Sequence, residues 1–177
     1  MTEAFDDDLM PLLEDDADQQ PSSADSVWKV LIVDDDEDVH QATKFALANT
    51  PILQRDLQFL HAHSAGQAIE LLKSESDIAV ILLDVVMESE DAGLKLVRII
   101  REDLDITEAR IILRTGQPGY APEIDAIRDY DINDYKTKSE LSRNRLYTAL
   151  TAAIRSYKQI HMINSSRRGL DMVIRAS

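Results

Sequence analysis

Residues Ile78 to Asp84 read IAVILLD, an unbroken apolar run that ends in a single aspartate. A strand that is apolar on both faces is typical of a parallel sheet with helices packed on both sides. The aspartate raises a question, because an unpaired carboxylate is costly to bury and usually finds a partner or is neutralised. The run therefore predicts a covered sheet, and Asp84 predicts a polar feature at the point where that strand ends.

Short apolar segments like this one alternate along the chain with segments that have a helical repeat. We expect strands at 28–33, 57–62, 78–84, 109–115 and 132–135, and helices at 39–48, from Ser64 onward, at about 91–103 and at 122–130. Strict alternation predicts a doubly wound α/β domain whose parallel strands are joined by right-handed crossovers. In such a domain ligands bind beyond the carboxyl ends of the strands.

Two helix starts can be described in more detail. Ser64 and Gln67 have the spacing of a capping box, in which each side chain bonds a free backbone N–H of the first turn. For the helix at 39–48 the repeat predicts one buried apolar face, made of Val39, Ala42, Phe45 and Ala46.

The composition limits the location and the partners of the chain. It has 33 acidic and 19 basic residues and a formal net charge of −14. Residues 1–28 hold nine of the acids and no base, so the rest of the chain has a net charge of −5. Nucleic acids and anionic membranes bind clustered Lys and Arg, so neither is an expected partner. Cysteine is absent, and neither an export signal nor a membrane span is evident, so we expect a cytoplasmic protein.

Polar residues collect where the predicted strands end. The first strand is followed by Asp34 and Asp35, the third ends at Asp84, the fourth at Thr115, and Lys138 follows the fifth. Three carboxylates at one rim would repel one another unless a cation lay between them, and oxygen ligands suit Mg²⁺. A lysine and a hydroxyl nearby would complete a site for a phosphoryl group, with Asp84 as the nucleophile.

The chain resembles the receiver domain of two-component response regulators over roughly residues 28–155. The resemblance rests on four motifs together, LIVDDDEDVH, ILLDVVM, ILRTG and NDYKTKSEL. It implies a flavodoxin-like, five-stranded parallel sheet of order 2-1-3-4-5 with an extended C-terminal helix. It also implies that a sensor histidine kinase or a phosphotransfer protein phosphorylates Asp84, which would lie at the solvated rim of the sheet, and that the change is passed to an output domain.

The resemblance assigns a metal site position by position. Asp35 would bind Mg²⁺ directly, Asp34 partly through water, and Asp84 through its own carboxylate. Val86, two residues after Asp84, would add its backbone carbonyl. The implied cofactor is therefore Mg²⁺ held by oxygen atoms.

The resemblance also assigns the residues that meet the phosphoryl group. Thr115 would move toward the phosphoryl oxygens, Tyr135 would be the coupled aromatic switch, and Lys138 would pair with the phosphate. Glu88 and Ser139 stand where the family usually has proline, so the two loops that hold them depart from the family pattern.

Three other interpretations have to be weighed. A small Mg²⁺-dependent phosphatase or phosphotransferase with an aspartyl-phosphate intermediate would use the same residue types, but it would need a general acid or base where Val86 stands. A flavodoxin-like cofactor binder would need a phosphate-binding loop where the acidic DDDED follows the first strand. His61 and His63 share a strand face, but zinc needs further ligands, so a packing or surface role is favoured. We expect a signalling switch, with any output enzyme outside this chain.

The chain divides into four expected parts: an acidic, disordered tail at 1–26, the receiver at 27–155, a signalling helix at 156–168 and the cut-off start of a downstream domain at 169–177. The helical pattern begins near Ser139 and continues to about Ser166. Its repeat places Tyr157, Ile160 and Asn164 in the seam of a parallel coiled-coil homodimer.

The tail, the segments RTGQPGYAPE and DINDYKTKSEL, and the long helix resemble one subgroup of the family. In that subgroup the receiver precedes a GAF-like domain of unknown function, often followed by a cyclic-di-GMP phosphodiesterase. The resemblance implies an output of this kind.

Overall fold

A computed structural model of the chain describes residues 27–116, 128, 132–137 and 142–175. Five parallel strands form one sheet in the order β2-β1-β3-β4-β5, as the resemblance implied. The strands are β1 (Val27–Val33), β2 (Asp56–Ala62), β3 (Ile78–Asp84), β4 (Arg110–Thr115) and β5 (Ile132–Thr137). The predicted fold class is therefore confirmed.

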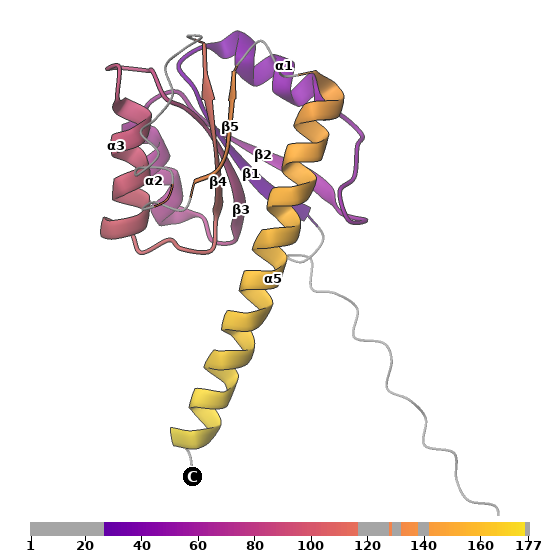
Figure 1. Ribbon diagram of the computed structural model, residues 1–177, viewed down its shortest axis with the longest axis vertical. Helices are drawn as coiled ribbons and strands as arrows, with labels where there is room; N and C mark the ends of the chain where they lie inside the picture. Colours follow the sequence, from indigo (N-terminus) through magenta and orange to yellow (C-terminus); the bar gives the residue numbers. More distant parts are fainter. Residues whose placement is uncertain (1–26, 117–127, 129–131, 138–141, 176–177) are drawn as a thin grey trace, which may run out of the picture.

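Helices cover both faces of the sheet (Figure 1). One face carries α2 (Ala65–Ser74) and α3 (Ala92–Arg98), which continues as a π-helical turn over Ile99–Asp103, and the other carries α1 (Glu37–Leu47) and α5 (Arg143–Arg175). The helix predicted at 122–130 lies outside the described residues, apart from Arg128. As the capping box predicts, Ser64 Oγ accepts a hydrogen bond from Gln67 N.

The core has two halves, one on each face of the sheet. Along β1, Leu31 and Val33 pack toward α2 and α3, whereas Val30 and Ile32 pack toward α1 and α5. All seven residues of β3 are buried, because this strand lies in the centre of the sheet. The chain thus builds two apolar layers that fix where the strand ends meet.

The predicted apolar face of α1 is wrong. Its buried residues are His40, Thr43 and Leu47, while the Phe45 side chain is 87% exposed. The inner face is polar because it lies over the polar end of the sheet, where Arg114 NH1 donates to Thr43 Oγ1. Of the other residues predicted to be buried, Ala42 is exposed and Val39 and Ala46 are half-buried.

Helix α5 has two parts with different surroundings. Its N-terminal half packs on the domain through Leu146, Leu150, Ile154 and Tyr157, and its C-terminal turns extend past the sheet (Figure 1). The helix is continuous through Gly169 to Arg175, so its backbone does not break at residue 168. The predicted start of a downstream domain at 169 stays a prediction. Within the described residues, no helix is both long enough and apolar enough to cross a bilayer.

Candidate functional site

Three carboxylates meet at the carboxyl end of the sheet, and we call Asp34, Asp35 and Asp84 the acidic trio. Strands β1 and β3 are parallel neighbours in which Val33 pairs with Leu83, so the next residues, Asp34 and Asp84, lie at the same rim. One ligand atom from each member of the trio lies within 4.8 Å of the other two. An all-oxygen set at this spacing fits a hard divalent cation such as Mg²⁺.

The members of the acidic trio differ in burial. Asp34 is 0% exposed and Asp84 is 3% exposed, whereas Asp35 is exposed. Asp84 therefore lies at the rim of the sheet as expected, but the expectation that solvent covers its side chain is wrong. The loop after β3 folds back over it, so that Gly93 N donates to Val85 O, and Val86 N lies 3.4 Å from Asp84 Oδ1. Solvent reaches the trio at Asp35.

Gly93 at the start of α3 is needed for this close approach. A Cβ atom at this position would lie 2.1 Å from the carbonyl oxygen of Asp84 and 2.7 Å from Cα of Val85. Both are backbone atoms of the segment that carries the carboxylate, so neither could rotate away. The glycine therefore allows α3 to lie directly against the strand end, a constraint that no sequence motif revealed.

A buried arginine lies beneath the acidic trio. Arg114 is 0% exposed and pairs in register with Asp84 on the neighbouring strand. Its NH2 lies 3.5 Å from Asp34 Oδ2, and its NH1 donates to Thr43 Oγ1 at 3.0 Å. Burial lowers the pKa of the Arg114 guanidinium, and the charges of Asp34 and Asp84 oppose that shift. Sequence reasoning missed this residue, although a basic residue inside an apolar strand was a signal.

A histidine pair fixes the backbone of the acidic segment. His40 is 1% exposed, and its Nε2 lies 2.8 Å from the carbonyl oxygen of Asp34, which can only accept. His40 Nδ1 is then free to accept from His61 Nδ1, 2.9 Å away. Burial, followed by repulsion from His40, lowers the pKa of His61. The His63 ring packs against His40 in a tilted arrangement, with ring centres 4.4 Å apart and an interplanar angle of 47°, so the packing role expected for His61 and His63 agrees with their contacts.

Of the remaining predicted site residues, Thr115 and Val86 lie fully within the described part of the chain. Thr115 ends β4, one residue beyond the pairing partner of Asp84, and is 0% exposed. Val86 follows Asp84 closely enough for its backbone to face the carboxylate. The backbone of Tyr135 pairs with Leu113, while its side chain, like all of Lys138, falls outside the described part of the chain.

Glu88, one of the two residues that stand where the family usually has proline, has a local partner. Its Oε1 accepts a hydrogen bond from the backbone N–H of Ala65 at 2.9 Å. Ala65 is the first residue of α2, where backbone N–H groups lack partners within the helix. Glu88 therefore ties the loop after β3 to the start of α2. Ser139, the other such residue, is outside the described residues.

The predicted dimer seam needs correction. Tyr157 is 6% exposed and packs edge-on against Trp28 with ring centres 6.3 Å apart, and Asn164 donates to Glu108. Burial, with the nearby charges of Asp77 and Glu108, raises the pKa of Tyr157 to about 12. These two side chains contact the body of their own chain, while Ile160 is half-buried.

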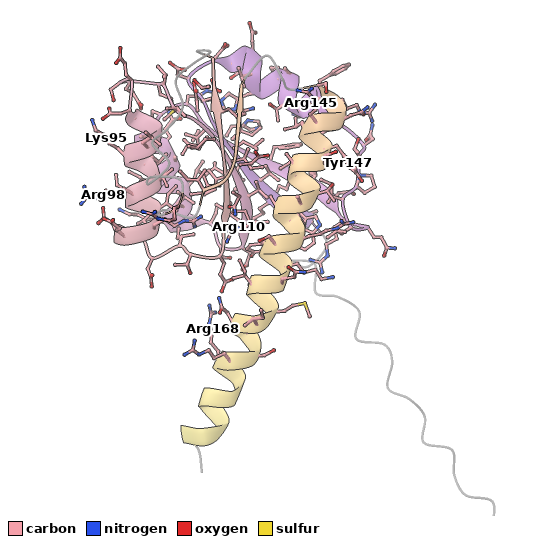
Figure 2. The ribbon with its side chains drawn as sticks, in the orientation of Figure 1. Lys95, Arg98, Arg110, Arg145, Tyr147 and Arg168 are labelled. Carbon is pink, nitrogen blue, oxygen red and sulfur yellow. The ribbon has the colours of Figure 1, made fainter. Side chains whose placement is uncertain are left out.

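Glu108, in the loop before β4, holds the helix where it leaves the domain. Its Oε2 accepts from His161 Nδ1 at 2.7 Å, and its Oε1 accepts from Asn164 Nδ2 at 2.9 Å and from Arg168 NH2 at 3.0 Å. Figure 2 shows Arg168 on the part of α5 that extends past the sheet. Partial burial works against ionisation of Glu108, but these hydrogen bonds and the charges of His161 and Arg168 hold its pKa below the ordinary value.

Comparison with known sequences gives a family for this arrangement. The response regulator receiver domain matches residues 30–151, and a domain of unknown function (DUF3369) matches residues 150–177. A curated relative, the 3'3'-cGAMP-specific phosphodiesterase 2 of Vibrio cholerae serotype O1, is 46% identical over 150 residues. The match covers 85% of this chain and 29% of the relative.

Solved structures of receiver domains have a similar fold. A CheY-like receiver domain protein from Methanospirillum hungatei JF-1 is 27% identical with a TM-score of 0.62, over 74% of this chain and 97% of that one. The signal receiver domain of an HD domain-containing protein from Pseudomonas fluorescens Pf-5 is 26% identical with a TM-score of 0.61, over 75% and 98% of the two chains. This chain therefore belongs to the response regulator receiver domains of two-component signalling.

Proposed function

We propose that Asp84 of this receiver accepts a phosphoryl group from a phosphohistidine on a sensor histidine kinase or a phosphotransfer protein. The observation that carries the proposal is the acidic trio, which sets Asp84 within 4.8 Å of two further carboxylates at the carboxyl end of the sheet. In the transfer, a carboxylate oxygen of Asp84 forms a bond to phosphorus as the phosphorus–nitrogen bond breaks. The donor imidazole leaves with that electron pair.

The acidic trio and the backbone carbonyl of Val86 would hold Mg²⁺. Bound there, the ion would neutralise the charge that builds up on the phosphoryl oxygens. Asp34 is held in place by His40 through its backbone and by Arg114 through its side chain. In this proposal Thr115 donates to a phosphoryl oxygen, Lys138 pairs with the phosphate, and Tyr135 responds to the movement of Thr115.

A phosphatase or phosphotransferase with an aspartyl-phosphate intermediate is the rival function. It would need a titratable group beside the nucleophile to activate water or to protonate a leaving group. The side chain at the expected position is the apolar, half-buried Val86. The site thus supports accepting a phosphoryl group more than releasing it in repeated cycles.

The output of the switch is proposed to lie beyond this chain. The chain spans 29% of the phosphodiesterase it matches, and its last residues match a domain of unknown function. Helix α5 leads from the receiver into that segment, so we place the route of the signal along α5. A phosphodiesterase acting on a cyclic dinucleotide would then be the controlled activity, in the cytoplasm as expected from the sequence.

A homodimer remains part of the proposal, through a different side of α5. Tyr157 and Asn164 contact their own domain, but Ile160, Ile163 and Arg167 also follow the spacings of three and four residues that coiled coils use. Ile163 is 66% exposed, and the same spacing continues to Leu170 and Ile174 in the sequence. A second copy of this helix is the proposed partner of that stripe.

The phosphorylation proposal is tested with acetyl phosphate as a small donor. The chain should gain one phosphoryl group by intact mass in the presence of Mg²⁺ and none after removal of the metal with EDTA. Asp84→Asn should abolish the gain. Asp91→Asn changes a partly exposed carboxylate in the loop after β3 that pairs with Lys95 of α3, and it should leave the gain unchanged. Labelling of the Asp84→Asn variant at the parent level would show that the assignment is wrong.

A further inference from the structure

The charge at the base of the site includes a cation, Arg114, whose effect on metal binding the phosphotransfer proposal does not address. Arg114 and Asp34 are both 0% exposed, so water does not screen the interaction between them. The contact is a single approach of 3.5 Å between NH2 and Oδ2, in place of the two parallel hydrogen bonds that arginine can make to a carboxylate. The pair therefore acts more through charge than through a tight hydrogen bond.

The guanidinium is also poorly satisfied for a buried group. Arginine has five N–H donors, and leaving such donors buried without acceptors is costly. Among the residues that the structure describes, Nε of Arg114 has no hydrogen-bond partner, and NH1 uses the Thr43 hydroxyl, which itself donates to Val39 O. An apolar residue would fill this place in β4 at lower cost, as Ile112 does two residues earlier on the same face. The arrangement is thus explained better by the need for a positive charge than by packing.

We propose that Arg114 is a resident counter-charge of the acidic trio that competes with Mg²⁺ and so sets the affinity of the site for the metal. Without metal, Arg114 offsets part of the repulsion among three carboxylates. When Mg²⁺ binds, Asp34 of the acidic trio already lies beside the positive charge of Arg114. The trio therefore binds Mg²⁺ more weakly than it would if Arg114 carried no charge. Arg114 is a positioning residue in this account, because it touches Asp34 and not the reacting atoms.

This competition has a consequence for control of the switch. A site that holds Mg²⁺ loosely is only partly loaded, so the rate of phosphorylation follows the Mg²⁺ concentration rather than being saturated. The inference rests on the proposed Mg²⁺-dependent function, and the experiment is arranged so that the two can fail separately.

The dissociation constant for Mg²⁺ is measured by titration calorimetry at pH 8 on the full chain, for the parent, Arg114→Met and Arg114→Lys. Removing one charge a few ångströms from Asp34 should tighten Mg²⁺ binding by about tenfold. The lysine variant keeps the charge and should stay within about twofold of the parent by the same reasoning. In addition, the rise in unfolding temperature on adding Mg²⁺ should be larger for Arg114→Met than for the parent.

Each result bears on one proposal. If Arg114→Met binds Mg²⁺ no more tightly than the parent, or if Arg114→Lys binds as tightly as Arg114→Met, the charge of Arg114 does not set the affinity. If the parent binds no Mg²⁺, the proposed function fails before the role of Arg114 is reached. Arg114→Gln is a second neutral variant with a polar side chain; if the methionine variant does not fold, the same comparison is made with glutamine.

Discussion

Replacing Glu108 by alanine should loosen the part of α5 that leaves the domain without unfolding the domain itself. The carboxylate accepts hydrogen bonds from His161, Asn164 and Arg168, which lie along one side of the helix. A hydrogen bond contributes about 1 kcal/mol net, but exposed ionic partners contribute less. The Arg168 side chain is 71% exposed and that of His161 is 43% exposed, so we expect a total of about 2 kcal/mol.

Amide hydrogen exchange measures this loss directly. A change of 2 kcal/mol corresponds to about 30-fold faster exchange for the amides from His161 to Arg168. Glu102→Ala is the matched control, because it removes an exposed carboxylate that pairs with Arg98 on its own helical segment. It should leave those amides unchanged. Exchange in Glu108→Ala within twofold of the parent would refute the role of Glu108.

The same contact predicts a pH dependence. The pKa of Glu108 is held below its ordinary value in the folded chain. Its contribution is therefore complete above the ordinary carboxyl pKa and is lost as the pH falls through the lower, folded-state pKa. Parent and Glu108→Ala should converge in their exchange rates toward acidic pH, and a difference that persists after protonation would contradict the electrostatic part of the argument.

Three further predictions concern Gly93, Tyr157 and Ile163. Gly93→Ala should lower the free energy of unfolding by about 1–3 kcal/mol in urea titrations and slow phosphorylation by acetyl phosphate, because its Cβ would meet the Asp84 backbone. Gly66→Ala is the control and should change neither quantity, because its Cβ has its nearest neighbour at 3.9 Å. The stability of the parent should fall as the pH rises from 10 toward 12, because folding raises the pKa of Tyr157 to about 12. Urea titrations at pH 9 and 11 should show a smaller loss for Tyr157→Phe, and an equal loss in both chains would contradict the role of Tyr157. Ile163→Asp should abolish self-association in light scattering while the exposed control Ser165→Asp keeps it, and a parent that is monomeric at high micromolar concentration would exclude the dimer.

The strand pattern could be predicted from the sequence because burial of the sheet on both faces leaves a strong signal. Strand β3 is apolar through Leu83, and all of its residues are buried. A polar residue directly follows β1, and a polar residue ends β3 and β4, so the sequence marks where each of these strands stops. Parallel strands bring those ends to one rim, so the acidic trio followed from the alternation of strands and helices.

The buried face of α1 could not be predicted from hydrophobic periodicity. The periodicity rule assumes that a helix buries its apolar residues, but α1 lies over the polar end of the sheet and buries His40 and Thr43 instead. Their partners are the carbonyl of Asp34, just after β1, and the guanidinium of Arg114 in β4. Such contacts depend on tertiary structure, so a local repeat carries no information about them.

Two of the three residues predicted for a dimer seam, Tyr157 and Asn164, contact their own domain for a related reason. The spacing of Tyr157 and Asn164 is that of a coiled coil, and the same spacing also serves a helix that packs on its own domain. Trp28 and Glu108, which lie far from α5 in the sequence, take up these two side chains. The repeat correctly indicated an amphipathic helix and could not tell which surface it would meet.

The central claim is that Asp84 is the phosphoacceptor. The most direct test is to phosphorylate the parent chain with acetyl phosphate and Mg²⁺, reduce the acyl phosphate with borohydride, and locate the modified residue by peptide mass spectrometry. Borohydride converts a phosphorylated aspartate to homoserine, so the account predicts homoserine at position 84 and unmodified Asp34 and Asp35. Homoserine at 34 or 35, or at any other aspartate with position 84 unchanged, would contradict it.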